Sequence, residues 1–122
     1  MPLKIKNPYK TLAIHAARAA DDKKALDIVV LDIHAASDIA DFVVIAGAES
    51  SAQMHAVEGA VEDALRELGY KPLRRDGRPR DRWMAIDYGA VFVHVLLTEA
   101  REFYRLEQLW DTAKKVTWKK HA

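Results

Sequence analysis

Short apolar runs alternate with amphipathic stretches along this chain of 122 residues. Residues 26–33 and 41–47 are rich in valine and isoleucine and are bounded by polar residues, which predicts two buried strands. Apolar residues then recur at the helical period from residue 57 to residue 68, and Ser50 and Gln53 have the Ser-x-x-Gln spacing of a capping box. We therefore expect a helix that starts after Ser50 and ends at Gly69.

The most apolar stretch, residues 81–97, predicts two strands joined by a tight turn at Tyr88-Gly89. Strand alternation divides the first strand into two sets that point to opposite faces: Trp83, Ala85 and Asp87 on one, and Met84, Ile86 and Tyr88 on the other. A strand that is buried on both faces can be apolar throughout. Asp87 and His94 are polar, so they are the first candidates for a functional role.

The remaining segments complete the predicted fold. Thr11 can cap an alanine-rich helix, residues 70–74 suit a short strand, and Thr98 can cap a last helix. That last helix would carry its apolar side chains on one face: Phe103, Leu106 and Trp110. The order α-β-β-α-β-β-β-α predicts an α/β layer fold with a mixed sheet of about five strands covered by helices. We expect a single domain over residues 11–113, a flexible tail over residues 1–10 and a basic, frayed tail over residues 114–122.

Composition narrows the class of protein. Half of the residues are apolar, which suits one globular domain, and no cysteine is present, which excludes disulfides and thiolate chemistry. The formal net charge is +1, but residues 71–82 hold six basic and two acidic residues. This segment is interpreted equally well as a solvated loop or as a basic patch that faces a partner. Neither a signal peptide nor a membrane span is recognised, so we expect a cytoplasmic protein.

The motifs that common enzymes require are missing. The sequence has neither a G-x-x-x-x-G-K-[ST] loop nor a G-x-S-x-G elbow, and its five histidines are scattered. We expect no cofactor and no metal. Asp38, Asp41 and Asp87 follow or precede strands, so one hypothesis brings them together on a magnesium ion. The favoured interpretation is that Asp38 and Asp41 cap loop backbone and that Asp87 begins a turn.

Two residues of the apolar hairpin have open interpretations. His94 suits a hydrogen-bonded core position, or a groove in which it lies beside Asp87 and each raises the charged fraction of the other. Trp83 suits the core, or an exposed position as an anchor for another protein, because tryptophan often dominates protein–protein binding energy.

Several segments, taken in order, resemble one family. The matching pieces are DIVVLD at residues 27–32, SDIADFVVIAG at 37–47, the Ser50 to Gln53 element, GYKPL at 69–73, Trp83, DYG at 87–89, HV at 94–95 and AREFYRLEQLW at 100–110. Together they resemble the ribosomal silencing factor family, also called Iojap or RsfS. The resemblance covers residues 10–113, and the order and spacing of the pieces are more specific than any one of them.

The resemblance implies a binding protein and not an enzyme. Members bind ribosomal protein fourteen of the large ribosomal subunit, block its joining with the small subunit, and repress translation when nutrients are scarce. The family fold is similar to that of nucleotidyltransferases. The Gly-Ser and Asp-x-Asp elements of those enzymes are absent here, since Ala48 follows Gly47 and no Asp-x-Asp occurs. The resemblance therefore implies a nucleotidyltransferase-like topology without the catalytic motifs.

The resemblance also implies a partner surface at the hairpin, with Trp83 as an anchor, Asp87 as an acceptor for a basic group and Met84 as an adaptable apolar contact. Its residues would be Trp83, Met84, Asp87, Tyr88 and His94. Arg101 and Glu102 lie in the matching C-terminal motif. Ala52 and Ala90 depart from the family pattern, which has an arginine at the first position and an acidic residue at the second. Each departure removes a charge near the expected surface.

Two further functions follow from individual features. A nucleotide-binding or nucleotidyltransferase-type enzyme on the related fold is the alternative, and it would use Asp38, Asp41 and Asp87. Self-association through the Trp83 region is the other, because an isologous dimer uses one patch twice. The basic segment 71–82 is also a candidate for contact with ribosomal RNA.

Overall fold

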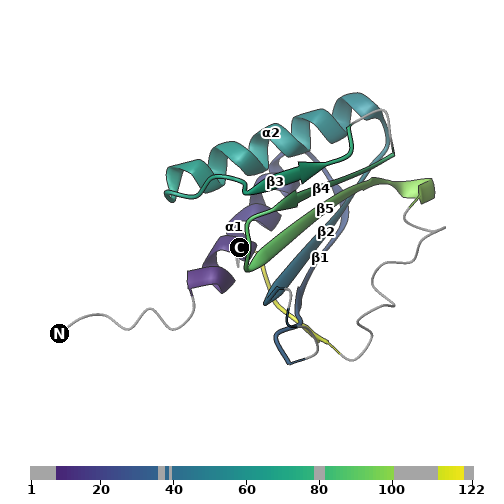
Figure 1. Ribbon diagram of the computed structural model, residues 1–122. Helices are drawn as coiled ribbons and strands as arrows, with labels where there is room; N and C mark the ends of the chain where they lie inside the picture. Colours follow the sequence, from purple (N-terminus) through teal and green to yellow (C-terminus); the bar gives the residue numbers. More distant parts are fainter. Residues whose placement is uncertain (1–7, 36–37, 39, 79–81, 101–112, 120–122) are drawn as a thin grey trace.

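One mixed sheet organises the part of the chain that the computed structural model describes, namely residues 8–35, 38, 40–78, 82–100 and 113–119 (Figure 1). Within these ranges the strands lie in the order β3-β4-β5-β2-β1-β6. Their bounds are β1 Leu26–Asp32, β2 Phe42–Ala48, β3 Arg74–Asp76, β4 Trp83–Asp87, β5 Val91–Leu97 and β6 Lys114–Lys115. Strands β2 and β5 are parallel, and each of the other neighbouring pairs is antiparallel. The mixed sheet confirms the expected fold class, with six strands described against about five expected.

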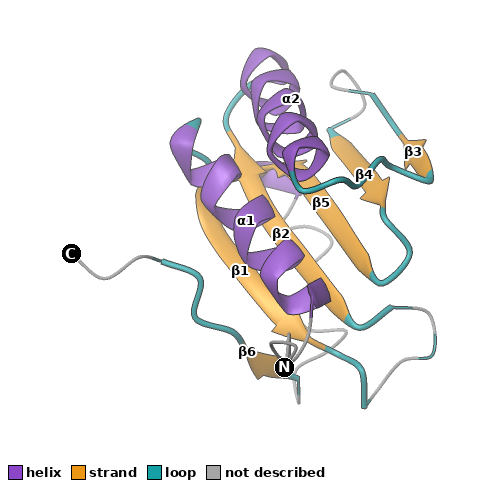
Figure 2. Cartoon of the chain, turned by 90° about the vertical axis from the view of Figure 1, so that its left-hand side faces the viewer, coloured by secondary structure: helices purple, strands orange, loops and turns teal. Residues whose placement is uncertain are grey.

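Two helices, α1 (Pro8–Asp22) and α2 (Ser51–Glu67), pack on the same face of this sheet. Figure 2 shows α1 in front of β1 and β2, and α2 beside it toward β5. We call the covered side the helix face. Every residue of β2 is buried, because this strand lies at the centre of the sheet between β1 and β5. The even-numbered residues of β2, such as Val44, point to the helix face and join the main core cluster with residues of both helices.

The odd-numbered positions of β2 point to the other side, which we call the opposite face. They join a second, smaller apolar cluster: Leu31, Ile33, Ala40, Val43, Ile45 and Leu96, with Val29, Trp83, Phe92 and Ala113 packed against them. The two clusters account for the uninterrupted apolar run of β2, since alternate residues contribute to different cores.

The start of α2 follows the capping box that its sequence predicts. The Ser50 side chain accepts a hydrogen bond from the backbone N–H of Gln53 at 3.0 Å, and Gln53 Oε1 accepts one from the N–H of Glu49 at 2.7 Å. The Gln53 amide also donates to the carbonyl oxygens of Lys23 and Lys24 at 3.1 and 3.0 Å. One glutamine therefore caps α2 and fastens it to the turn between α1 and β1. At the other end Gly69 has φ of +93°, as a residue that follows a helix C-terminus often does.

The structure differs from the sequence predictions at three element boundaries. Helix α1 begins at Pro8 and not after Thr11, because proline needs no hydrogen-bond acceptor in the first turn of a helix. The strand expected over residues 70–74 begins at Arg74, where the chain pairs with β4. The end of the chain was expected to be frayed, yet Lys114–Lys115 pair with β1 as β6.

The segment after β6 is also fixed to the fold. The backbone N–H of Val116 donates to the carbonyl of Val30 at 2.8 Å, and Trp118 Nε1 donates to the carbonyl of Ile28 at 3.2 Å. The partly buried Trp118 ring packs against the main core. The basic residues around it in the sequence give no indication of this apolar contact. Residues 98–100 are helical, while Phe103, Leu106 and Trp110 of the predicted last helix lie outside the described residues. None of the helices in the described ranges has the length and apolar character needed to cross a bilayer.

Candidate protein-binding surface

The β4–β5 pair collects partly exposed side chains on the opposite face of the sheet. The antiparallel register sets Trp83 opposite Leu96, Ala85 opposite His94, and Asp87 opposite Phe92. Residues directly across an antiparallel pair lie on the same face. We define the Trp83 surface by the members of this set that remain partly exposed: Trp83, Ala85, Asp87, Phe92 and His94. Neither α1 nor α2 covers it, because both helices lie on the other side of the sheet (Figure 2).

A hydrogen bond joins the two aromatic heterocycles of this surface. Trp83 Nε1 donates to His94 Nδ1 at 3.0 Å, with the ring centroids 5.9 Å apart and the ring planes tilted by 55°. Burial lowers the pKa of His94 to about 4, so the imidazole is neutral at physiological pH. Because the indole N–H can only donate, Nδ1 is the ring nitrogen without a proton. His94 is hydrogen-bonded and largely shielded from water, as the first interpretation of the sequence expects, but its partner is Trp83, while Asp87 accepts a bond from the turn backbone.

A shallow hollow of about 310 Å³ lies beside the Trp83–His94 pair, and it is lined by Asp76, Gly77, Trp83, Ala85 and His94. Asp76 ends β3, and Gly77 follows it with φ of +82°. A side chain at Gly77 would collide with the backbone carbonyl of Trp83. Glycine is required here both by the backbone conformation and by the close approach of β3 to β4.

Gly77→Ala is expected to destabilise this end of the sheet. A positive φ costs an alanine about 1 kcal/mol, and the collision with the Trp83 carbonyl adds to that cost. Urea unfolding would measure the loss. Gly59→Ala is the matched control, because a Cβ at Gly59 meets nothing within 4 Å and the position is helical, where alanine is favoured. Equal stability of the two variants would contradict the prediction.

Asp87 stabilises the turn between β4 and β5. Its Oδ1 accepts a hydrogen bond from the backbone N–H of Gly89 at 2.7 Å, as the favoured interpretation of the sequence predicts. Gly89 has φ of +89°, which the tight turn between β4 and β5 requires. Among the described residues, no three histidine or carboxylate side chains are grouped so that they could hold a metal ion, and Asp38 and Asp41 do not form such a group with Asp87.

The structure does not bring all five expected surface residues together. Met84 is 2% exposed and Tyr88 is 7% exposed, and both join the main core on the helix face. Burial raises the pKa of Tyr88 to about 12, and among the described residues its buried hydroxyl has no hydrogen-bond partner. Trp83, Asp87 and His94 lie on the opposite face. The five residues therefore do not form one continuous patch, because side chains on the two faces of a sheet point in opposite directions.

The site also contains residues that the sequence reasoning missed. Phe92 precedes His94 by two positions, so strand alternation alone would have placed it on the same face. Asp76 ends β3 and Gly77 follows it, and the two residues reach the hollow because Asp76 pairs with Ala85 in the sheet. That pairing has no local signal, since β3 is a three-residue strand of exposed charged side chains.

The basic segment next to the Trp83 surface is partly neutralised. Arg75 points to the helix face and binds Glu62 of α2 through two hydrogen bonds, of 2.6 and 2.8 Å. Arg74 Nε lies 4.0 Å from Asp76. Exposed ion pairs contribute little to stability, so these contacts mainly set where the positive charge lies. Residues 73–78 are all exposed, and residues 79–81 lie outside the described residues.

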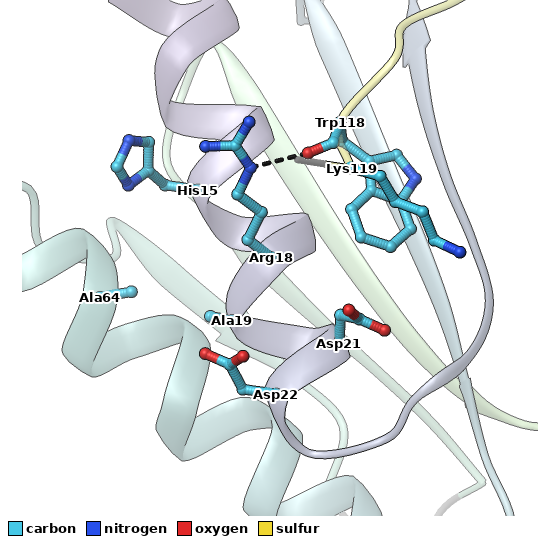
Figure 3. Close-up of a pocket in the computed structure, with 8 residues that line it drawn as sticks. All are labelled: His15, Arg18, Ala19, Asp21, Asp22, Ala64, Trp118 and Lys119. Atoms are coloured by element: carbon cyan, nitrogen blue, oxygen red, sulfur yellow. Dashed lines mark hydrogen bonds between the residues drawn. The ribbon is translucent and has the colours of Figure 1, made fainter. Parts of the chain in front are cut away.

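A second hollow, of about 450 Å³, lies between the helices and the end of the chain (Figure 3). It is lined by His15, Arg18, Ala19, Asp21, Asp22, Ala64, Trp118 and Lys119. In Figure 3 the Arg18 side chain reaches from α1 to Trp118, where its Nε donates to the backbone carbonyl at 2.7 Å. Arg18 therefore holds the backbone at Trp118 against α1. The lining mixes both signs of charge, and it lies on the helix side, away from the Trp83 surface.

Comparisons with known proteins identify close similarity over most of the chain. The family model described as "Ribosomal silencing factor during starvation" matches residues 6–122. The chain is 36% identical over 104 residues to the ribosomal silencing factor RsfS of Bacillus subtilis. This match covers 85% of this chain and 88% of that protein. It is also 29% identical over 91 residues to a mouse protein named for mitochondrial assembly of the ribosomal large subunit, covering 72% of this chain and 40% of the mouse protein.

A solved structure is similar as well. A crystal structure of a Chromobacterium violaceum protein superposes with a TM-score of 0.80 and 28% sequence identity, and the match covers 93% of each chain. The resemblance read from the sequence motifs is thus confirmed by the family model and by the similar proteins, and the fold is shared over nearly the whole length.

Proposed function

The chain belongs to the ribosomal silencing factor family, and on this premise we propose that it binds the large ribosomal subunit through the Trp83 surface and blocks joining with the small subunit. The proposed partner on the large subunit is ribosomal protein fourteen. Occupation of the face where the two subunits meet would exclude the small subunit by steric overlap. The consequence would be repression of translation when nutrients are limiting, in the cytoplasm where the ribosomes lie.

The observation that carries the proposal is a partly exposed tryptophan on a sheet face that α1 and α2 leave open. Trp83 lies beside Phe92 and the buried apolar residues Val43 and Leu96, which gives a rigid apolar centre. Asp87 and the exposed charges of β3 lie at the edge of this centre. An apolar centre with a polar rim is the usual anatomy of a protein–protein interface, and tryptophan is the residue most enriched among its binding hot spots.

The family supports a regulatory protein in place of the nucleotide-handling enzyme that was the alternative. No observation specifically favours that enzyme. Its candidate carboxylates do not form a metal site among the described residues, and Asp87 is engaged in its turn.

The basic segment beside the Trp83 surface extends the proposed contact from ribosomal protein to ribosomal RNA. Residues 71–78 and Arg82 lie beside the Trp83 surface, so we propose that they contact ribosomal RNA when the protein is bound. Each phosphate contact would add to the salt dependence of binding, because it releases counterions.

A homodimer that uses the Trp83 surface would compete with the ribosome for the same residues, and light scattering across a concentration series would detect it.

Co-sedimentation with separated ribosomal subunits tests the function. The purified protein should sediment with large subunits and not with small ones, and its addition should lower the fraction of joined ribosomes when the two subunits are mixed. Prior formation of joined ribosomes should protect them, since steric exclusion requires access to the face between the subunits. Binding to neither subunit, or joining that is unchanged at saturating protein, would contradict the proposal.

A further inference from the structure

We infer that His94 is a positioning residue for ribosome binding, which fixes the Trp83 indole in the orientation that the partner meets. This inference rests on the proposed function and deepens it. The resemblance to the family places His94 at the partner surface without distinguishing a contact from a supporting role. The geometry points to the supporting role, in which the side chain acts through Trp83.

The hydrogen bond assigns the roles of the two rings. An indole N–H can only donate, so His94 Nδ1 must be the acceptor in the 3.0 Å contact, and the proton of the neutral imidazole lies on Nε2. Trp83 and His94 are diagonal neighbours, since Ala85 is the residue directly across from His94. Diagonal pairs lie within reach of aromatic side chains, and the small Ala85 leaves room for the indole to lean over it.

This contact prepares Trp83 for burial in an interface. A tryptophan that must be ordered on binding loses side-chain freedom, and a side chain held beforehand avoids part of that loss. A partner that covers Trp83 also removes water from the indole N–H, and an unpaired buried donor is costly. His94 already accepts that proton, so the partner does not have to supply an acceptor.

The surroundings keep His94 neutral. Asp76 from β3 is the charged group that shares its hollow, Trp83 and Ala85 face it from β4, and the paired residue on β2 is Ile45. Because burial lowers its pKa from 6.5 to about 4, the neutral form is favoured by folding, and protonation at Nδ1 would abolish the acceptor. The bond should therefore persist at neutral pH and be lost only as the pH falls toward the folded pKa.

The indole resonance of Trp83 tests the first half of the inference without any ribosome. In ¹⁵N-labelled full-length protein, the Trp83 indole signal is assigned as the one missing from Trp83→Phe. His94→Leu should shift this signal and speed its hydrogen exchange, whereas His94→Asn should keep the signal protected, because asparagine Oδ1 can occupy the place of Nδ1. An indole signal that His94→Leu leaves unchanged would overturn the inference.

Binding to the large subunit tests the second half. Loss of one preorganising hydrogen bond should weaken binding of His94→Leu roughly tenfold, while His94→Asn should stay within about twofold of the parent. In a Trp83→Ala background, His94→Leu should cause no further loss, which neither a direct contact nor general destabilisation would produce. His55→Leu is the matched control, because His55 is an exposed residue of α2 on the helix side.

The outcomes separate the inference from the function. If Trp83→Ala weakens binding while His94→Leu binds as the parent does, the positioning role is wrong and the proposed surface stands. If His94→Leu weakens binding equally with and without Trp83, His94 acts independently of the indole, and the inference is overturned. If Trp83→Ala binds normally, the proposed surface fails, and with it any role of His94 in binding through Trp83.

Discussion

Trp83→Ala is expected to weaken binding to the large ribosomal subunit about 30-fold or more, which corresponds to about 2 kcal/mol or more, as truncation of a central hot-spot residue usually does. Trp83 combines the features of such a residue. It is partly exposed, it packs on the buried cluster of the opposite face, and its polar atom is already bonded to His94. Truncation removes the apolar contact area and leaves a hollow that the partner cannot fill. Quantitative co-sedimentation with purified large subunits measures the effect.

The Trp83→Ala experiment needs a control for loss of any exposed apolar side chain. Leu68 is 40% exposed at the end of α2, on the helix side of the sheet, so Leu68→Ala should bind as the parent does. Circular dichroism should show that both variants are folded at the assay temperature. A folded Trp83→Ala protein that binds with parental affinity would reject the Trp83 surface, even if the protein still binds the subunit elsewhere.

The parts of the fold that sequence reasoning predicted have strong local signals. The apolar runs of β1, β2, β4 and β5 are long enough to be recognised alone, and the capping box of Ser50 and Gln53 marks the start of α2. Alternation along β4 predicted that Trp83 and Asp87 point one way and Met84 the other, and the structure confirms it. The sequence therefore predicted which residues share a face before the sheet order was known.

The features that sequence reasoning missed depend on contacts between distant segments. Strands β3 and β6 consist of exposed charged residues, and their pairing is fixed by the strands beside them and not by their own pattern. Trp118 packs against the core although basic residues surround it in the sequence. The grouping of Met84 and Tyr88 with Trp83 failed for another reason, because a motif gathers residues that are adjacent in the chain and does not separate those that contact a partner from those that pack beneath them.

The sequence grouped the candidate site residues without predicting which of them contact one another. Trp83, Asp87 and His94 share a face, but the sequence offered Asp87 as the neighbour of His94, whereas the structure pairs His94 with Trp83 and Asp87 with the turn. The choice depends on register, since a shift of a single residue between β4 and β5 would move every side chain of one strand to the other face. The register between β4 and β5 follows from the turn at Gly89. The sequence indicated this turn, but it did not predict that Trp83 would contact His94.

Phe42→Ala is expected to cost about 3–5 kcal/mol of folding free energy, as truncation of a fully buried phenylalanine usually does. Phe42 begins β2, is 1% exposed, and lies between Asp32 of β1 and Val91 of β5 on the helix face. The cavity left by the ring would be closed on its sides by strands whose backbones are paired, so little collapse can relieve it. Urea unfolding should show a lower midpoint with an unchanged slope. Leu73→Ala is the matched control, because Leu73 is 73% exposed, and it should change stability by less than about 0.5 kcal/mol.

The Phe42 variant also separates stability from recognition. Phe42 faces the helices, so the folded fraction of Phe42→Ala should bind the large subunit with parental affinity at a temperature where the variant remains folded. Trp83→Ala should behave in the opposite way, with most of its stability kept and its binding lost. A folded Phe42→Ala protein that binds as weakly as Trp83→Ala would mean that the opposite face cannot hold its shape without an intact helix-side core. A loss of stability below about 1 kcal/mol would instead mean that the site collapses easily, contrary to its position between paired strands.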